Sequence, residues 1–246
     1  MSEVVEYETN QLDLIWHDDG RVTNDTHQDP AIPRVEGYST YWLAADLGQA
    51  NDYSAVVAIK DEALPIIDEG KVIVGPRERS IVYADRFRGV SYVNVVDHLI
   101  RLRNAPPFAG KTELSIDGTS IGRVVSDMLW DQGVDHKAVQ MTGGQDWRKA
   151  TARYVNAGKT FMIENLAVLF ASGDIKFAHD LPLRKEIEED LASFATTTTA
   201  AGNQIITQSR NATGHGDLGI ALIVAAFASQ YLKPGKILVS QLRGWA

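Results

Sequence analysis

Three aspartates stand where an acidic side chain is costly to bury. Asp46 ends the apolar run of residues 41–45, Asp117 ends a second short apolar run, and Asp217 precedes the most apolar stretch of the chain. A buried carboxylate is destabilising unless a cation compensates its charge. Ligand sets made only of oxygen favour Mg²⁺ or Mn²⁺ over zinc, and the absence of cysteine excludes a thiolate site. The pattern therefore indicates a divalent-metal centre, provided that the three side chains converge.

The chemistry that such a centre supports is phosphodiester hydrolysis. Two divalent ions about 3.5–4 Å apart can activate the attacking water and stabilise the leaving 3′-oxygen of an in-line displacement. Each aspartate also has a simpler interpretation. Asp46 could lie in a hairpin turn, Asp117 could belong to the turn before Gly118, and Asp217 could cap a helix. Only the combination of all three favours a metal site.

The composition is that of an ordinary globular protein with an acidic balance. The 246 residues include 24 Lys and Arg against 32 Asp and Glu, which gives a net charge of −8. This balance argues against non-specific binding of nucleic acids. The chain cannot form a disulfide, no apolar run reaches the length of a membrane span, and the acidic N-terminus does not resemble a signal peptide. We therefore expect a cytoplasmic protein.

Strand and helix patterns alternate along most of the chain. Runs of β-branched and apolar residues predict strands, and apolar residues at helical spacing predict helices. The predicted strands are residues 41–46, 54–59, one interrupted strand over 71–74 and 80–84, then 112–117, 137–140, 174–178 and 204–208. The predicted helices are residues 92–104, 121–131, 160–170, 183–194 and 217–232. Turns or loops are expected at residues 61–70, 143–153 and 196–203.

This order of elements predicts an α/β fold, in which a mixed β-sheet with antiparallel edge strands is flanked by helices on both faces. Residues 1–36 are predicted to form an acidic extension or linker, residues 37–232 the folded domain, and residues 233–246 a C-terminal tail. Ligands of such sheets bind at the carboxyl ends of the strands. Asp46 and Asp117 stand at those ends, so the metal centre is expected there.

The motifs together resemble the nuclease domain of the large terminase subunit of tailed bacteriophages. The resemblance runs from about Tyr38 to Leu232. Its first part is the strand and turn with Asp46, Gly48, Asp52 and Ser54, and its second is the strand LSID that ends at Asp117. The most specific part is the C-terminal third, where these motifs follow in order: Lys159, LFASGDIK at 169–176, the segment 188–194, and His215, Gly216 and Asp217 before an Ala-rich helix.

The resemblance implies an RNase H-like fold and an endonuclease that cuts concatemeric double-stranded DNA during genome packaging. It implies that Asp46, Asp117 and Asp217 bind two Mg²⁺ or Mn²⁺ ions. Asp52 matches a recurrent acidic position, although it could equally cap a turn. His215 could contact the scissile phosphate or could be structural. The implied partners are double-stranded DNA, the terminase ATPase motor, the small terminase subunit and the portal, in the cytoplasm of a host cell and without a membrane.

Large terminase subunits carry their ATPase motor ahead of the nuclease, whereas only about 36 residues precede the matching region here. We therefore expect an isolated nuclease domain or a separately encoded nuclease subunit, with the motor supplied from elsewhere. DNA contacts are expected from basic residues that hold phosphates without recognising bases. The candidates, each of which could also be an ordinary surface charge, are Arg148, Lys149, Arg153, Lys159 and Arg210.

Other functions remain open at this point. A junction resolvase or an RNA–DNA hybrid nuclease would share the fold and the carboxylates. An ATPase related to actin and the sugar kinases is a further alternative, because Asp46, Gly48 and Ser54 faintly resemble its first phosphate motif. That alternative lacks a second Gly-rich phosphate motif and gives Asp217 no role. A scaffold without activity would not require the three aspartates.

Overall fold

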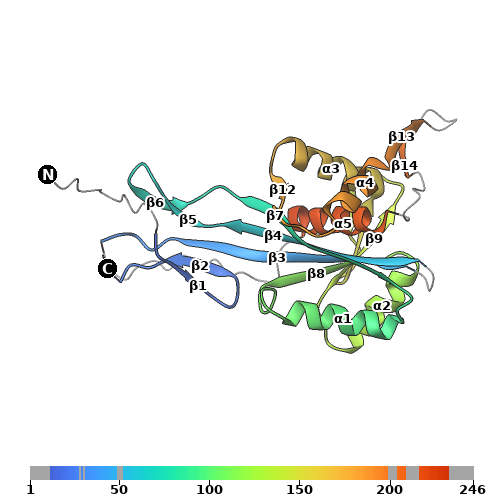
Figure 1. Ribbon diagram of the computed structural model, residues 1–246, viewed down its shortest axis with the longest axis horizontal. Coiled ribbons are helices and arrows are strands. Elements are labelled where there is room, and N and C mark those ends of the chain that lie inside the picture. Colours follow the sequence, from blue (N-terminus) through green and yellow to red (C-terminus); the bar gives the residue numbers. More distant parts are fainter. Residues whose placement is uncertain are drawn as a thin grey trace.

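The computed structural model describes residues 12–27, 29, 31–48, 52–198, 204–208 and 216–232. In this part of the chain, ten strands form one mixed sheet and five helices cover its two faces (Figure 1). The strands of this sheet are β1 (Leu14–Trp16), β2 (Arg21–Asn24), β3 (Glu36–Asp46), β4 (Tyr53–Ala63), β7 (Glu78–Arg88), β8 (Thr112–Asp117), β9 (Lys137–Thr142), β10 (Trp147–Lys149), β11 (Tyr154–Gly158) and β12 (Ile175–Phe177). The helices are α1 (Tyr92–Asn104), α2 (Ile121–Asp131), α3 (Lys159–Ala171), α4 (Arg184–Ala192) and α5 (Asp217–Tyr231).

The sheet has the order β10-β11-β9-β8-β3-β4-β7-β12, and the hairpin β1–β2 pairs with β3. β3, β8, β9 and β11 are parallel to one another, and β4 lies antiparallel between β3 and β7. β10 is antiparallel to β11, and β12 is parallel to β7. The mixed α/β class predicted from the sequence is confirmed.

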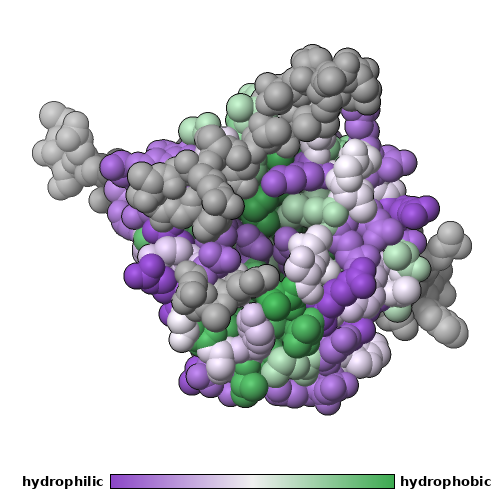
Figure 2. Space-filling model, turned by 90° about the vertical axis from the view of Figure 1, so that its right-hand side faces the viewer, coloured by the Kyte–Doolittle hydropathy of each residue, from purple (hydrophilic) through white to green (hydrophobic). Residues whose placement is uncertain are grey.

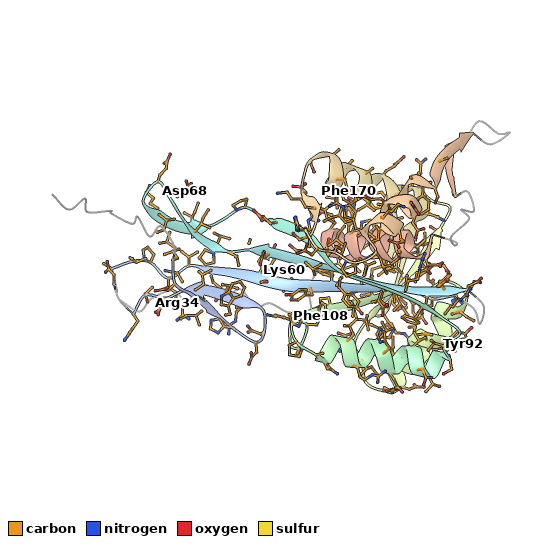
Figure 3. The ribbon with its side chains drawn as sticks, in the orientation of Figure 1. Arg34, Lys60, Asp68, Tyr92, Phe108 and Phe170 are labelled. Carbon is orange, nitrogen blue, oxygen red and sulfur yellow. The ribbon has the colours of Figure 1, made fainter. Side chains whose placement is uncertain are left out.

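Two apolar layers enclose the sheet. α1 and α2 pack on one face, and α3, α4 and α5 pack on the other; Figure 3 shows Phe108 and Phe170 on these opposite sides. α5 lies against β3 and β4, and every residue from Asp217 to Ser229 is buried. A helix that is apolar all round must be enclosed in this way. None of the helices in the described part of the chain combines the length and hydrophobicity needed to cross a bilayer.

Several loop predictions were wrong. The region expected as a loop at residues 143–153 contains β10 and the approach to β11, which together form an antiparallel hairpin. The turn expected at residues 61–70 contains the end of β4 and the whole of β5 (Pro65–Asp68). β5 pairs with β6 (Lys71–Val74). The loop expected at residues 196–203 begins within β13 (Phe194–Thr198), which pairs with β14 (Gln204–Gln208). These short strands depend on their pairing partners and lack a strong local pattern.

The predicted N-terminal extension also contributes to the sheet. β1 and β2 pair with each other, and β2 pairs with the first residues of β3. In Figure 1 the long strands β3 and β4 extend to the left beyond the helices, and the hairpins β1–β2 and β5–β6 lie at that end.

The helix bounds agree more closely with the sequence predictions than the loops do. α2 has the predicted bounds, and the Ser91 side chain caps α1 by accepting from the Asn94 N–H.

A buried carboxylate fastens the C-terminal end of α5 to the sheet. Asp61 on β4 is 2% exposed and accepts hydrogen bonds from Trp42 Nε1 (3.1 Å) and from Arg77 Nε (2.9 Å) and Nη2 (2.6 Å). The same Arg77 Nη2 donates to the carbonyl oxygen of Ser229 at 2.6 Å. This carbonyl belongs to the last turn of α5, where helical carbonyls lack partners within the helix.

Replacing this carboxylate should loosen α5. We expect Asp61→Ala to lower the free energy of unfolding by about 1–3 kcal/mol, because it leaves buried donors without an acceptor. Thermal unfolding monitored by circular dichroism measures the change, at roughly 2–4 °C per kcal/mol for a chain of this size. Asp68→Ala, at an exposed position of β5, is the matched control. Equal melting temperatures for the two variants would contradict the assignment.

Candidate active site

The parallel pairing of β3 with β8 brings two of the predicted aspartates together. Ala45 pairs with Ile116, so Asp46 and Asp117 each stand one residue beyond this pair, at the carboxyl ends of neighbouring strands. Asp217, the first residue of α5, reaches the same place. All three line one cavity of about 220 Å³, and Asp52 lines it as well. Figure 2 views this end of the molecule, where apolar side chains reach the surface between hydrophilic ones.

Among the three carboxylates, Asp46 has the ionised form that the fold destabilises most. Burial raises its pKa well above the ordinary value of 3.8, and the negative charges of Asp117 and Asp217 raise it further. The N–H of Leu47 and the ammonium group of Lys159 oppose this rise without cancelling it. A carboxylate in this position therefore favours either a proton or a cation.

Asp117 is oriented by its own turn. Its Oδ1 accepts hydrogen bonds from the backbone N–H of Thr119 at 2.9 Å and from Thr119 Oγ1 at 2.8 Å. Burial raises the pKa of Asp117, and these two bonds and Lys159 lower it. α2 begins directly after this turn, and a Cβ at Gly122 would lie 1.7 Å from the Asp117 carbonyl oxygen. Only glycine therefore permits this close approach of α2 to the end of β8.

Asp217 is held in place by another helix. The N-cap residue of α5 is Gly216, which has no side chain to cap the helix. Instead, Asp190 of α4 accepts hydrogen bonds at Oδ2 from the N–H groups of Leu218 (3.1 Å) and Gly219 (3.2 Å). These are among the N–H groups that a helix cannot satisfy internally. A Cβ at Gly219 would lie 3.1 Å from the Asp190 Cβ, so the glycine lets α4 come close enough to act as the cap.

Lys159 supplies a positive charge that acts on Asp46 and Asp117. It is the first residue of α3, and its ammonium group lies 5.4 Å from the centre of the Phe194 ring. Burial lowers the pKa of Lys159, whereas Asp46 and Asp117 raise it. One lysine cannot neutralise three carboxylates, so the cavity keeps an excess of negative charge.

The donor set of the cavity suits a hard divalent cation, because it consists of carboxylate oxygens. Within the described part of the chain, however, no three acidic or histidine side chains form a ready-made ion-binding group.

The arrangement of helices and strands is shared with known nucleases. The large terminase nuclease domain of Thermus phage P74-26 matches with a TM-score of 0.52 and 22% sequence identity, over 90% of this chain and 92% of that one. The large terminase nuclease of thermophilic phage G20c matches with a TM-score of 0.51 and 23% identity, over 86% and 89%. The chain has the fold of a phage large terminase nuclease. The G20c nuclease with bound magnesium gives a TM-score of 0.50 at 22% identity, over 84% and 86%. No protein-family model and no curated protein matches the sequence.

Within this terminase nuclease fold, the predicted basic residues fall into different places. Arg148 and Lys149 are exposed on the edge strand β10. Arg153 lies just before β11, at the opposite end of that strand from Gly158 and α3. It donates to Asp127 Oδ1 at 2.7 Å and lies over the ring of Trp130. His215 and Arg210 lie outside the described residues.

Some residues near the cavity were not predicted from the sequence. Asp190 falls within the helix predicted at residues 183–194, but it was not predicted as part of the site. Arg86 and Arg88 of β7 both lie over the ring of Tyr53, at 4.7 Å and 5.2 Å. Their alternate spacing places both on one face of the strand, which is a signal that the sequence does contain. The cap formed by Asp190 depends on tertiary contact and has no local signal.

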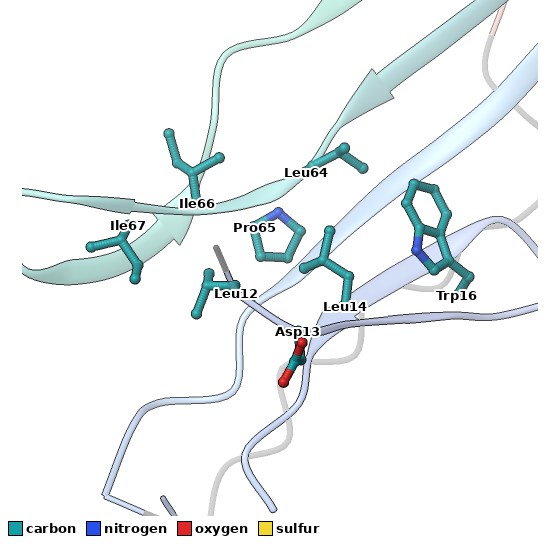
Figure 4. A pocket seen from close by; sticks show the side chains of 8 residues that line it. All are labelled: Leu12, Asp13, Leu14, Trp16, Leu64, Pro65, Ile66 and Ile67. Carbon is teal, nitrogen blue, oxygen red and sulfur yellow. The ribbon is translucent and has the colours of Figure 1, made fainter. Parts of the chain in front are cut away.

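A larger cavity lies at the far end of the sheet. It has a volume of about 520 Å³, lies between β1 and β5, and is lined mainly by apolar side chains such as Trp16 and Ile66 (Figure 4). Asp13 is the one acidic residue of its lining. Without a group of convergent polar side chains, it is a poorer candidate for chemistry than the smaller acidic cavity.

The metal-free protein should gain stability when a carboxylate of the cluster is neutralised. Because folding raises the pKa of Asp46, its contribution to stability is full below the ordinary pKa of 3.8 and is lost as the pH rises through the raised value. Asp46→Asn removes this loss. We expect the variant to melt several degrees above the unsubstituted protein in EDTA at neutral pH, with the difference shrinking as the pH falls. Asp68→Asn is the control, and an equal or lower melting temperature for Asp46→Asn would count against a charged cluster.

The cap formed by Asp190 can be tested by comparing two substitutions. Asp190→Ala removes the acceptor and should lower the free energy of unfolding by about 0.5–2 kcal/mol, the usual effect of losing a cap. Asp190→Asn keeps an oxygen acceptor and should lose less. Glu188→Ala, on the exposed face of the same helix, should change stability by less than about 1 kcal/mol. Chemical denaturation measures all three, and equal losses for Asp190→Ala and Glu188→Ala would refute the cap.

Proposed function

We propose that the chain is a metal-dependent DNA endonuclease of the terminase type, which cuts concatemeric double-stranded DNA during genome packaging. One observation carries the proposal: Asp46, Asp117 and Asp217 line a single cavity at the strand ends, in a fold shared with large terminase nucleases. The bound magnesium of the G20c nuclease supports a divalent ion for this chain also.

In this proposal, the carboxylates of Asp46, Asp117 and Asp217 hold two Mg²⁺ or Mn²⁺ ions. Such ions supply the activation of water and the stabilisation of the leaving 3′-oxygen. Other residues of the chain would position these ligands. Thr119 orients the Asp117 carboxylate, and Asp190 fixes the start of α5 and with it Asp217. Asp52 and His215 are proposed as accessory residues.

Lys159 has a separate role in the proposal. Its ammonium group acts on Asp46 and Asp117 and lowers the pKa of each. It thereby favours the ionised carboxylates that a metal ion requires. A partly buried lysine at the start of α3 therefore favours the deprotonated form of Asp46 and Asp117, although burial still raises the pKa of both.

DNA and the packaging machinery are the proposed partners. With a net charge of −8, the chain alone should bind DNA weakly, because duplex affinity depends on cations that contact phosphates. Delivery of the duplex by an ATPase motor, with the small terminase subunit and the portal, would compensate for this weakness. The same net negative charge should slow the cutting of DNA that no motor presents.

Cleavage by the purified chain is the direct test. We expect nicking of supercoiled plasmid and cutting of linear duplex in Mn²⁺ or Mg²⁺, and none in EDTA. Asp46→Asn, Asp117→Asn and Asp217→Asn should each reduce cleavage to background while the circular dichroism spectrum stays unchanged, because each removes a metal ligand. Asp68→Asn should cleave normally. Added Mn²⁺ should raise the melting temperature of the unsubstituted protein by mass action.

The same assay separates the alternatives. Preferential cutting of four-way junctions or of RNA–DNA hybrids would replace the terminase assignment with one of the other nucleases of this fold. Nucleotide binding in calorimetry, without cleavage, would instead support the ATPase related to actin and the sugar kinases. Normal cleavage by any one of the three Asp→Asn variants would remove that residue from the site.

A further inference from the structure

A second cavity adjoins the acidic one and has the opposite charge character. Its volume is about 410 Å³, and it shares Thr119 and Ser120 with the acidic cavity. The remaining lining residues are Arg123, Gln140, Met141 and Thr142, so the lining contains one cation and no carboxylate. A polar cavity with a single positive charge, immediately beside a carboxylate cluster, suits an anion that must lie next to that cluster.

Arg123 is held in this cavity by a neutral amide. When the Gln140 amide is oriented to satisfy its neighbours, its oxygen accepts from Arg123 Nε at 3.0 Å and Nη2 at 2.8 Å. Its nitrogen then donates to Asn156 Oδ1 at 2.9 Å. The guanidinium is thus fixed in orientation, and among the described residues it has no carboxylate partner and its Nη1 makes no hydrogen bond, so that Nη1 can donate to a ligand. A fixed guanidinium is well suited to a phosphate group.

Other arginines of the described chain are used differently. Arg77 is paired with Asp61 at 2.6 Å, Arg153 with Asp127 at 2.7 Å, and Arg184 with Glu188 at 2.9 Å. In those pairs the positive charge serves the fold. Arg123 forms no such pair within the described residues, so its charge is available to a partner.

The polar row continues from this cavity to the edge of the sheet. Gln140 of β9 pairs with Asn156 of β11, and Asn156 pairs with Arg148 of β10. Residues that pair directly across strands lie on the same face of a sheet, here the face that α2 covers. Arg148 is exposed and forms no ion pair within the described residues. Two uncompensated arginines therefore lie at the ends of a row whose middle consists of two amides.

We propose that this row is a binding track for the sugar–phosphate backbone of one DNA strand beside the cleavage site. Arg123 binds the phosphate nearest the acidic cavity, Gln140 and Asn156 line the middle, and Arg148 binds a phosphate farther along the strand. The proposal rests on the nuclease function proposed above and specifies how its substrate is held. Contacts of this kind position a duplex without selecting its sequence.

Binding of a fluorescently labelled duplex, measured by anisotropy with Ca²⁺ in place of Mg²⁺, tests the track independently of cleavage. Arg123→Gln and Arg148→Gln should each weaken binding several-fold at low salt. Each should also make the slope of log K against log salt less negative by about 0.9, the value for one lost phosphate contact. In the cleavage assay the two variants should raise KM more than they lower kcat, because they remove binding that is common to ground state and transition state.

Arg101→Gln is the matched control, because Arg101 is exposed in the last turn of α1, on the same face of the sheet. Melting temperatures show whether each variant is folded. Arg123→Lys, which keeps the charge, should bind DNA more tightly than Arg123→Gln. If Arg123→Gln is unstable, the binding of Arg148→Gln alone tests the track. The track is refuted if both variants keep the original affinity and slope, if Arg101→Gln weakens binding equally, or if the unsubstituted chain binds no duplex. Arginine-dependent binding without cleavage would instead refute only the nuclease.

Discussion

The placement of α5 is the constraint on which the candidate site depends. This helix is apolar on all sides and therefore must lie enclosed on the sheet, where apolar burial is not directional. Two polar attachments add directional contacts at its ends. Arg77 holds the Ser229 carbonyl at one end, and Asp190 holds the first N–H groups at the other. Asp217, the first residue of the helix held in this way, lines the cavity at the strand ends.

The same placement creates an unfavourable concentration of charge. Asp46 is the residue on which burial and repulsion act most strongly, and Lys159 offsets only part of the effect. Such a cluster does not stabilise the apoprotein, and proteins tolerate local destabilisation of this kind chiefly at functional sites. Hydrogen bonds to Asp117 and the cap on α5 fix the positions of the carboxylates without neutralising them. The fold thus holds the charges close while leaving them available to a cation.

The sequence predicted those features that depend on neighbouring residues. The strand ends at Asp46 and Asp117 and the start of α5 follow from local hydrophobic patterns, and the mixed sheet follows from their order. β10 was missed because an exposed three-residue strand exists only through its pairing with β11. Arg153 could not be distinguished from Arg148 in the sequence, although Asp127 neutralises one and no described residue neutralises the other. The Asp190 cap and the Gln140 amide likewise depend on contacts between distant segments.

On the proposed function, the separation of paired arginines from those without a carboxylate partner would explain how an acidic chain can be suited to a polyanionic substrate. A carboxylate cluster repels a phosphate backbone, and an isolated arginine nearby offsets only part of that repulsion. Divalent ions in the acidic cavity would reverse the sign of its potential, so ion binding and DNA binding must favour each other by thermodynamic reciprocity. On the proposed function, the arginine row fixes where the strand lies, and the ions determine when it can approach. A strongly basic surface would lose this dependence, because it would hold DNA whether or not the ions were present.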